Sequence, residues 1–523
     1  MSSSGRSDTS LFLLTALSLS IGWGIRGNFG HEFGAMIPGA LAAMAAVLLS
    51  GRDDWRRRIA FFGFFGALGW SFGGSISYMQ VIGYTHSGHS PSVLYGFACL
   101  FVIGFLWAAM GGAGTALPVF LDRRELTGFF PPLSAVFIAW WLQDIGEAWF
   151  IRVSSEYRQE SPLYWYDTDW LAALLAIVSV LVFALIQRRW SSASSLVLHM
   201  ALGWWIGFLL LVIALGLRMT PPRGDNWAGC VGMVGGMLVY FWRRGWTGLM
   251  FATLVTGFVG GFGFAVATLL KLIEIRSGAD TNWHSVLEQT YGLINGLGIA
   301  LAISWLARRA PKVDDEPPDW RWTEAYAVGF ILVGITWLNL RRIPGDLIQR
   351  KLLADSLSGL PTNVWFDLGY ALLAVCIVCL LMRHLHRPLP CVPSDWLGKG
   401  QLLYLVFLWW VVVGNLGRAL TAFTAQRLVT EGVIQLNAMI CTLLVVLCPG
   451  RERTVDVGLR TDFGLLARKV LALGIAGFVL TTAAEWRVVR AIYGDQFAGY
   501  AGKHIRFGPN ATTGNPPPGS PHP

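Results

Sequence analysis

The chain has 523 residues, of which 54% are hydrophobic and only 14% are charged. Soluble domains carry about 25% charged residues, so this composition excludes the soluble enzyme classes and intrinsic disorder of the whole chain. The net charge of +9 comes from short basic clusters between apolar runs, which indicates membrane topology rather than nucleic-acid binding. We therefore expect membrane lipid as a partner and no nucleic acid.

The apolar runs predict an all-α, polytopic membrane helix bundle with about fifteen transmembrane helices, fourteen being the alternative count. In chain order the expected helices cover residues 11–25, 35–49, 59–84, 93–121, 126–151, 170–187, 196–217, 227–242, 248–272, 285–307, 323–340, 363–382, 402–417, 432–448 and 464–486.

Every second connection between these runs is short and basic, as in Arg52–Arg58 and Arg243–Arg244. The positive-inside rule places such connections in the cytoplasm, so we expect a multi-pass protein of the cytoplasmic (inner) membrane with a cytoplasmic N-terminal tail over residues 1–10. An odd helix count then puts the C-terminal tail, 487–523, outside. Its proline- and glycine-rich end predicts disorder from about residue 507.

An internal repeat is suggested by similar short segments about 190 residues apart, such as Gly24–Arg26 and Gly216–Arg218. Six helices separate the two copies, so both have the same membrane orientation and the repeat is parallel. We therefore expect a first repeat of about six helices over 11–190 and a second over 191–383. About three additional helices follow over 384–486.

The first outer hairpin, Gly22–Ala40, carries the strongest candidate site. Its apolar arms of about 15 residues would reach about 22 Å, against about 30 Å of hydrocarbon. Arg26, Asn28, His31 and Glu32 would then lie at membrane depth, where short glycine-interrupted helices often mark a transporter's binding site. The structural alternative is a buried Arg26–Glu32 pair that only holds the hairpin closed.

Two other outer segments extend this candidate substrate site. Glu288 lies about one turn inside its predicted helix, while Asn415 and Arg418 end another helix much as Gly24–Arg26 does. His31 and Glu32 lack the further ligands that a zinc site needs, so we expect no metal and no cofactor. Tryptophans at several helix ends are expected to form an interfacial belt: Trp23, Trp149, Trp227, Trp283, Trp337 and Trp365.

Asp144 and Glu147 lie three residues apart in one apolar run, so they share a helix face. Carboxylates at membrane depth are functional candidates by default, and two neighbouring ones can share a proton. We expect this pair to serve in proton coupling. The alternative is that both acids only pair with arginines of neighbouring helices.

These patterns favour a secondary transporter of a small polar solute, anionic or sugar-like, with proton coupling. No Walker A motif is present in the sequence, so an ATP-driven pump is not expected. A second reading is an integral-membrane transferase that acts at the outer leaflet on a lipid-linked phosphate donor. A third is a non-catalytic subunit of a larger complex, and self-association is a further alternative for the partner.

Overall fold

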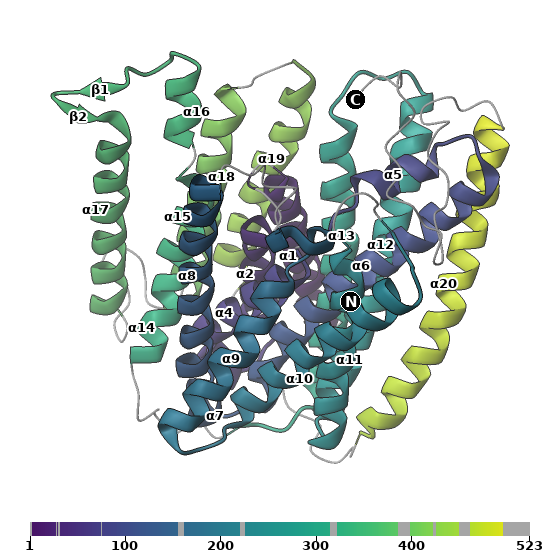
Figure 1. Cartoon of the computed structure of the whole chain (residues 1–523), viewed down its shortest axis with the longest axis horizontal. Helices are drawn as coiled ribbons and strands as arrows, with labels where there is room; N and C mark the ends of the chain where they lie inside the picture. The colour runs from purple at the N-terminus through teal and green to yellow at the C-terminus, as the bar shows by residue number, and fades with distance from the viewer. Residues whose placement is uncertain are drawn as a thin grey trace.

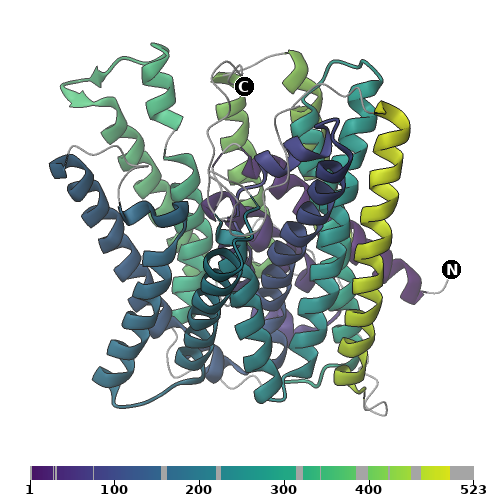
Figure 2. The same ribbon diagram turned by 45° about the vertical axis from the view of Figure 1, so that its right-hand side comes forward.

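The computed structural model of the chain is almost entirely helical (Figures 1 and 2). It describes residues 3–27, 29, 32–74, 76–154, 162–219, 225–313, 322–341, 343–384, 398–421, 425–448 and 461–494. Of the predicted site residues, Asn28 and His31 lie outside this set, and the side chains of Glu32 and Arg418 are not described.

The long helices are α1 (Ser3–Arg26), α2 (Glu32–Leu48), α4 (Ile59–Gly73), α6 (Ser90–Phe120), α8 (Phe130–Ser154), α9 (Trp170–Gln187), α10 (Ser192–Gly207), α11 (Asn226–Arg243), α12 (Thr247–Arg276), α13 (Trp283–Arg309), α17 (Thr362–Arg383), α18 (Lys399–Thr421), α19 (Ala425–Leu447) and α20 (Phe463–Tyr493). Shorter helices are α3 (Asp53–Arg56), α5 (Met79–Thr85), α7 (Arg123–Thr127), η2 (Pro162–Asp167), α14 (Trp322–Gly329), α15 (Thr336–Leu340) and α16 (Ile343–Gln349). Two π-helical segments, η3 (Phe208–Ala214) and η4 (Phe330–Ile335), continue α10 and α14. Strands β1 (Ser356–Leu357) and β2 (Leu360–Pro361) form a small antiparallel hairpin.

Twelve helices in the described part of the chain are long and apolar enough to cross a membrane, and two shorter apolar helices cover Phe33–Leu48 and Ile59–Gly73. Each of the fifteen predicted runs contains a helix, although α11, which matches the run at 227–242, is not among the twelve. The all-α prediction is confirmed, and the chain is a multi-pass membrane protein. The division into two repeats stays a prediction.

Several predicted helices have different bounds in the structure; α1, for example, begins at Ser3 rather than near residue 11. The run at 59–84 breaks after Gly73, which packs on the Trp107 ring of α6, and resumes at Met79 as α5. The last helix extends to Tyr493 rather than ending near residue 486, since Val489 is still buried against its neighbours. The break before α5 matters most, because it places Tyr78 inside the bundle.

The core of the bundle is formed by α1, α2, α4, α6, α12 and α13, which pack on one another, while α17 and α20 stand at opposite edges (Figure 1). Between core helices, glycine replaces side chains at the contacts. On α13, a Cβ atom at Gly292 would lie 2.6 Å from the Leu19 carbonyl of α1, and one at Gly296 would lie 2.5 Å from the Ala16 Cα atom. In lipid such close backbone contact drives helix association, because burial from water is not available.

The same Gly-Trp-x-x-Gly pattern is used in two helix pairs. In α4, Gly69 faces the Met110 carbonyl of α6, and in α10, Gly203 faces the Gly232 carbonyl of α11. The tryptophan that follows each glycine covers a glycine of the partner helix, as Trp70 covers Gly111. These two pairs form closely packed units on which the neighbouring helices assemble.

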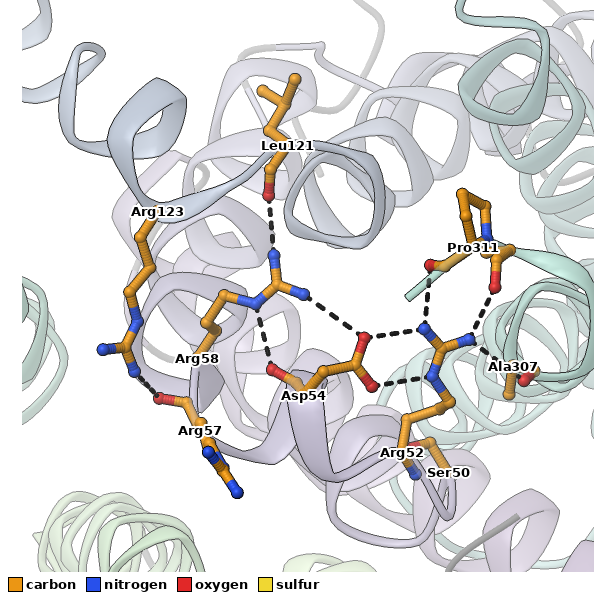
Figure 3. A network of polar contacts seen from close by, with 10 residues as sticks. Ser50, Arg52, Asp54, Arg57, Arg58, Leu121, Arg123, Ala307 and Pro311 are labelled. Atoms are coloured by element: carbon orange, nitrogen blue, oxygen red, sulfur yellow. Dashed lines mark hydrogen bonds and ion pairs between the residues drawn. The ribbon is translucent and has the colours of Figure 1, made fainter. Parts of the chain in front are cut away.

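The basic turn between α2 and α4 holds several helix ends together (Figure 3). Arg52 forms a bidentate ion pair with Asp54, with nitrogen–oxygen distances of 2.8 and 2.7 Å. It also donates to the carbonyls of Ala310 and Pro311 after α13, at 2.8 and 2.9 Å. Arg58 donates to the Leu121 carbonyl at the end of α6, at 2.7 Å. Both arginines are buried, so they tie the turn to α6 and α13 in addition to any part in topology.

The electrostatics of this turn depend on Asp54. Burial alone would raise its pKa, but the hydrogen bonds and charge of Arg52, together with the charge of Arg58, hold the pKa of this carboxyl below its usual value. A lowered folded-state pKa means that the charged carboxylate stabilises the fold at pH values above its ordinary pKa. The stabilisation is lost as the pH falls through the folded-state pKa.

We expect Asp54→Ala to lower the free energy of unfolding by about 3–5 kcal/mol, because it leaves two buried guanidinium groups without their carboxylate. The matched control is Asp53→Ala, since Asp53 pairs with Arg56 at 2.7 Å but its side chain is 49% exposed. That change should cost about 0–1 kcal/mol. Unfolding in detergent at neutral pH measures both, and equal losses would contradict a structural role for the network.

Candidate functional site

The candidate site is centred on Arg26, the last residue of α1, which is 1% exposed. Its Nη1 atom lies 3.5 Å from Oε1 of Glu288 on α13, and Glu288 is 3% exposed. The sequence pointed to both residues but proposed Glu32 as the structural partner of Arg26. The described ion pair joins Arg26 to a residue 262 positions along the chain, and the pairing with Glu32 stays a prediction because that side chain is outside the described part.

Local packing explains how two distant residues meet. Helix α1 is followed by Gly27, where a Cβ atom would collide with the Glu288 carboxylate. Gly24 lies against the Gln289 side chain, and Gln289 donates to the Thr430 carbonyl of α19 at 3.1 Å. A side chain at either position would displace the Glu288 carboxylate or the Gln289 side chain from its present place.

Aromatic rings enclose the guanidinium group. The Arg26 Cζ atom lies 4.6 Å from the Trp23 ring centroid, 5.1 Å from that of Trp107 and 5.7 Å from that of Tyr78. The Trp23 and Trp107 rings stack with centroids 5.0 Å apart. Cation–π contacts of about 2 kcal/mol or more are expected when the cation is desolvated, so these rings replace part of the lost hydration of Arg26.

Polar contacts connect the buried pair with the surface. The Tyr78 hydroxyl donates to Glu288 Oε1 at 2.8 Å. His284, one turn before Glu288 on α13, places Nε2 at 3.6 Å from the same oxygen, and its side chain is 37% exposed. The buried carboxylate is thus one side chain away from the exposed end of α13.

The rim of the site is basic. Lys271 of α12 is half-buried and is close enough to Glu288 for the two charges to attract. His86 follows α5, outside the spanning helices. Burial, followed by the positive charge of Lys271, lowers the pKa of His86 to about 4. His86 is therefore neutral near pH 7, and Lys271 supplies the positive charge at this rim.

Other predicted site residues lie in different surroundings. Asn415 on α18 donates to the buried Glu431 of α19 at 2.5 Å, and Thr430, next to Glu431, accepts a hydrogen bond from Gln289 beside the Arg26 site. Arg418 lies on α18 and Glu32 begins α2, but their side chains are not described.

The predicted proton-coupling pair lies on α8, which packs mainly on α9. Asp144 is exposed, and Glu147 is half-buried and accepts a hydrogen bond from Gln143 at 2.7 Å. The structure does not bring these carboxylates to the Arg26 site. Their part in proton coupling stays a prediction.

Several site residues had no clear sequence signal. Trp23 was expected in an interfacial belt, which is wrong, because it is buried and stacked on Trp107. Trp107 lies in the middle of a long apolar run, and Tyr78 follows a helix break that the apolar pattern does not show. Only His284 could have been found, since it lies four residues before Glu288 and so shares its helix face.

Within the described ranges, no group of three or more histidine, cysteine, aspartate or glutamate side chains is placed to hold a metal ion. What the site offers is a paired cation and anion, a phenol hydroxyl and aromatic rings. This combination can bind a small polar molecule by hydrogen bonds and ring contacts. No protein-family model matches the chain, and no curated protein or solved structure is significantly similar to it.

A mutant cycle separates the structural from the functional role of the ion pair. Arg26→Ala and Glu288→Ala should each lower the free energy of unfolding by about 3–5 kcal/mol, because each leaves a buried charge without its partner. The double variant Arg26→Met with Glu288→Leu should be about as stable as the wild type. Unfolding in detergent tests this. A double variant as unstable as the single ones would show that the pair is needed for the fold.

Proposed function

We propose that the chain is a secondary transporter that binds a small polar solute between Arg26 and Glu288. The observation that carries the proposal is the ion pair itself, buried between α1 and α13 and enclosed by aromatic rings. A buried ion pair is not an efficient way to stabilise a fold, because apolar residues of similar size do so equally well. Ionisable residues inside a membrane bundle are therefore functional candidates by default.

The position of the pair in the chain supports transport. Arg26 and Trp107 come from the first predicted repeat, while Glu288 and Lys271 come from the second. Transporters with internal repeats commonly bind their substrate where the repeats meet, and movement of one against the other exposes the site to alternate sides. Arg52 donates to a carbonyl at the opposite, basic end of α13, whereas His284 lies near the exposed end of that helix.

The charge balance of the site favours an uncharged solute over an anion. Arg26 and Glu288 compensate each other in the core, so an anion that bound Arg26 would leave the Glu288 carboxylate buried and uncompensated. A polyhydroxylated, sugar-like solute can donate to Glu288 and accept from Arg26 and Tyr78 at once. The flanking tryptophans suit the apolar faces of a sugar ring. A zwitterion or an anion would be the alternative outcome.

The transferase alternative has less support. A lipid-phosphate site needs an arginine that is open to the membrane edge, whereas Arg26 is buried and already paired. Arg218, the corresponding arginine in the predicted second repeat, is also buried and forms an ion pair with Asp225. Both arginines are thus engaged by carboxylates of the chain itself.

We expect purified protein in liposomes to take up one class of solute from a panel of radiolabelled neutral sugars, zwitterionic amino acids and carboxylates. The folded double variant Arg26→Met with Glu288→Leu should lose at least about 90% of that uptake, because both recognition groups are gone. The exposed-loop variant Asp355→Asn serves as the control and should transport normally. Uptake that survives in the double variant would overturn the assignment of the site.

The proposed orientation places the N-terminus and the basic turns in the cytoplasm. We expect a cysteine at Arg244, in the turn between α11 and α12, to be protected from a membrane-impermeant maleimide in intact cells. A cysteine at Asp280, between α12 and α13, should be labelled. The wild type has Cys376 and Cys379 on an exposed helix face, so its labelling gives the background signal. The reverse labelling pattern would show that the chain has the opposite orientation in the membrane.

A further inference from the structure

A second buried acid lies apart from the Arg26 site, on the edge helix α20. Glu485 is 2% exposed, and neither of its carboxylate oxygens has a hydrogen-bond partner among the described residues. Thr482, one turn earlier on the same face, is 5% exposed and its hydroxyl is also without a partner in that part of the chain. By the helical rise, Glu485 lies about 12 Å from the Tyr493 end of the helix.

The surroundings of Glu485 are apolar. Helix α20 packs on α6 and α12, and the cluster between them consists of Val93, Phe97 and Phe101 of α6, Ala265 and Leu272 of α12, and Val489 of α20. An ionised carboxylate without a partner in such a place would cost several kcal/mol. The neutral, protonated acid fits this environment, and its hydroxyl and carbonyl oxygen are one helical turn from Thr482.

The charged and titratable groups on the three packed helices are engaged elsewhere or point away. On α20, Arg487 and Arg490 are exposed, Arg490 lies over the Trp486 ring at 5.7 Å, and the Tyr493 hydroxyl donates to the Leu272 carbonyl. On α12, Lys271 faces His86 and Glu288, and Glu274 and Arg276 lie beyond it toward the helix end. On α6, the Tyr95 hydroxyl donates to the Arg218 carbonyl at 3.1 Å, and Cys99 lies beside Tyr95. No described cation lies within ion-pair distance of Glu485.

We propose that Glu485 is a proton-binding site, and that the proton is the ion coupled to transport. The second part rests on the proposed transport function, whereas the first stands on the burial of the acid alone. In this assignment the acid binds one proton as its carboxylate becomes a carboxylic acid, and it releases the same proton when water reaches it. Glu485 thereby takes the role that the sequence suggested for Asp144 and Glu147.

The two sites lie on either side of one helix pair. Trp107 of α6 and Phe264 of α12 face Arg26 and Tyr291, whereas the neighbouring Phe101 and Ala265 face the α20 cluster. Between the two, α6 and α12 meet at glycines. A Cβ atom on Gly104 would lie 2.5 Å from the Gly260 carbonyl, and one on Gly261 would lie 2.5 Å from the Phe101 ring.

This arrangement couples the sites through α6 and α12. With Glu485 protonated, α20 packs tightly on the pair. Loss of the proton requires the carboxylate to be hydrated, which displaces α20 from the apolar cluster and frees α6 and α12 to move. Because Trp107 lies on α6, that movement reaches the ring that stacks on Trp23 beside Arg26.

Infrared difference spectroscopy of the full chain in lipid nanodiscs tests the proton site without any solute. The wild type should show the carbonyl band of a protonated carboxylic acid near neutral pH, and Glu485→Gln should lose it. The control Asp367→Asn, on an exposed face of α17, should keep the band. Glu485→Asp should also keep it, which separates loss of the acid from loss of the fold. A band that persists unchanged in Glu485→Gln would overturn the proposal.

Uptake in liposomes then tests the coupling, with whichever solute class of the panel is transported. A proton gradient should increase wild-type accumulation several-fold, while Glu485→Gln should lose this increase and retain exchange of solute down its gradient. If the band is confirmed but no solute is taken up, the proton site is supported and the proposed transport function is wrong. If uptake remains proton-driven in Glu485→Gln, the coupling role of Glu485 is wrong, while its assignment as a proton-binding site is unaffected.

Discussion

The ion pair between Arg26 and Glu288 is the constraint on which the centre of the molecule depends. Two opposite charges in an apolar bundle are tolerated only when they meet and when neighbouring groups replace their lost water. Trp23, Trp107 and Tyr78 provide those neighbours at ring distances between 4.6 and 5.7 Å. The helices that carry these residues, α1, α6 and α13, converge at this point, and the break before α5 brings Tyr78 to it.

Glycine is what permits that convergence. In a membrane, helices gain little from burial because lipid is as apolar as leucine, so close backbone contact has to provide the attraction. Gly292 and Gly296 bring α13 against α1, and Gly104 and Gly260 bring α6 against α12. Between α6 and α12, side chains also fit onto glycines of the partner helix, as Phe105 does at Gly257 and Phe101 at Gly261. This closely packed pair lies between the two proposed sites.

The opposite end of the bundle uses polar contacts in place of glycine. Arg52 and Arg58 occupy carbonyl groups at the ends of α13 and α6, groups that no intrahelical bond can satisfy. Their charge is compensated by Asp54 in the same turn. A basic cluster that the sequence explains by topology alone therefore also fixes the spacing of three helices.

Composition and periodicity determined the class of the protein, because 54% hydrophobic residues in long runs leave no alternative to a helical membrane bundle. They also singled out Arg26 and Glu288, since charges in apolar runs stand out without any structure. Only the tertiary structure decided that these two residues are partners, because the local hairpin suggested Glu32 and nothing in the sequence measures a contact across 262 positions. It likewise decided that Asp144 faces outward while Glu485 is buried, since both lie in apolar helices. Which face of such a helix meets protein is set by packing against neighbours, not by the residue alone.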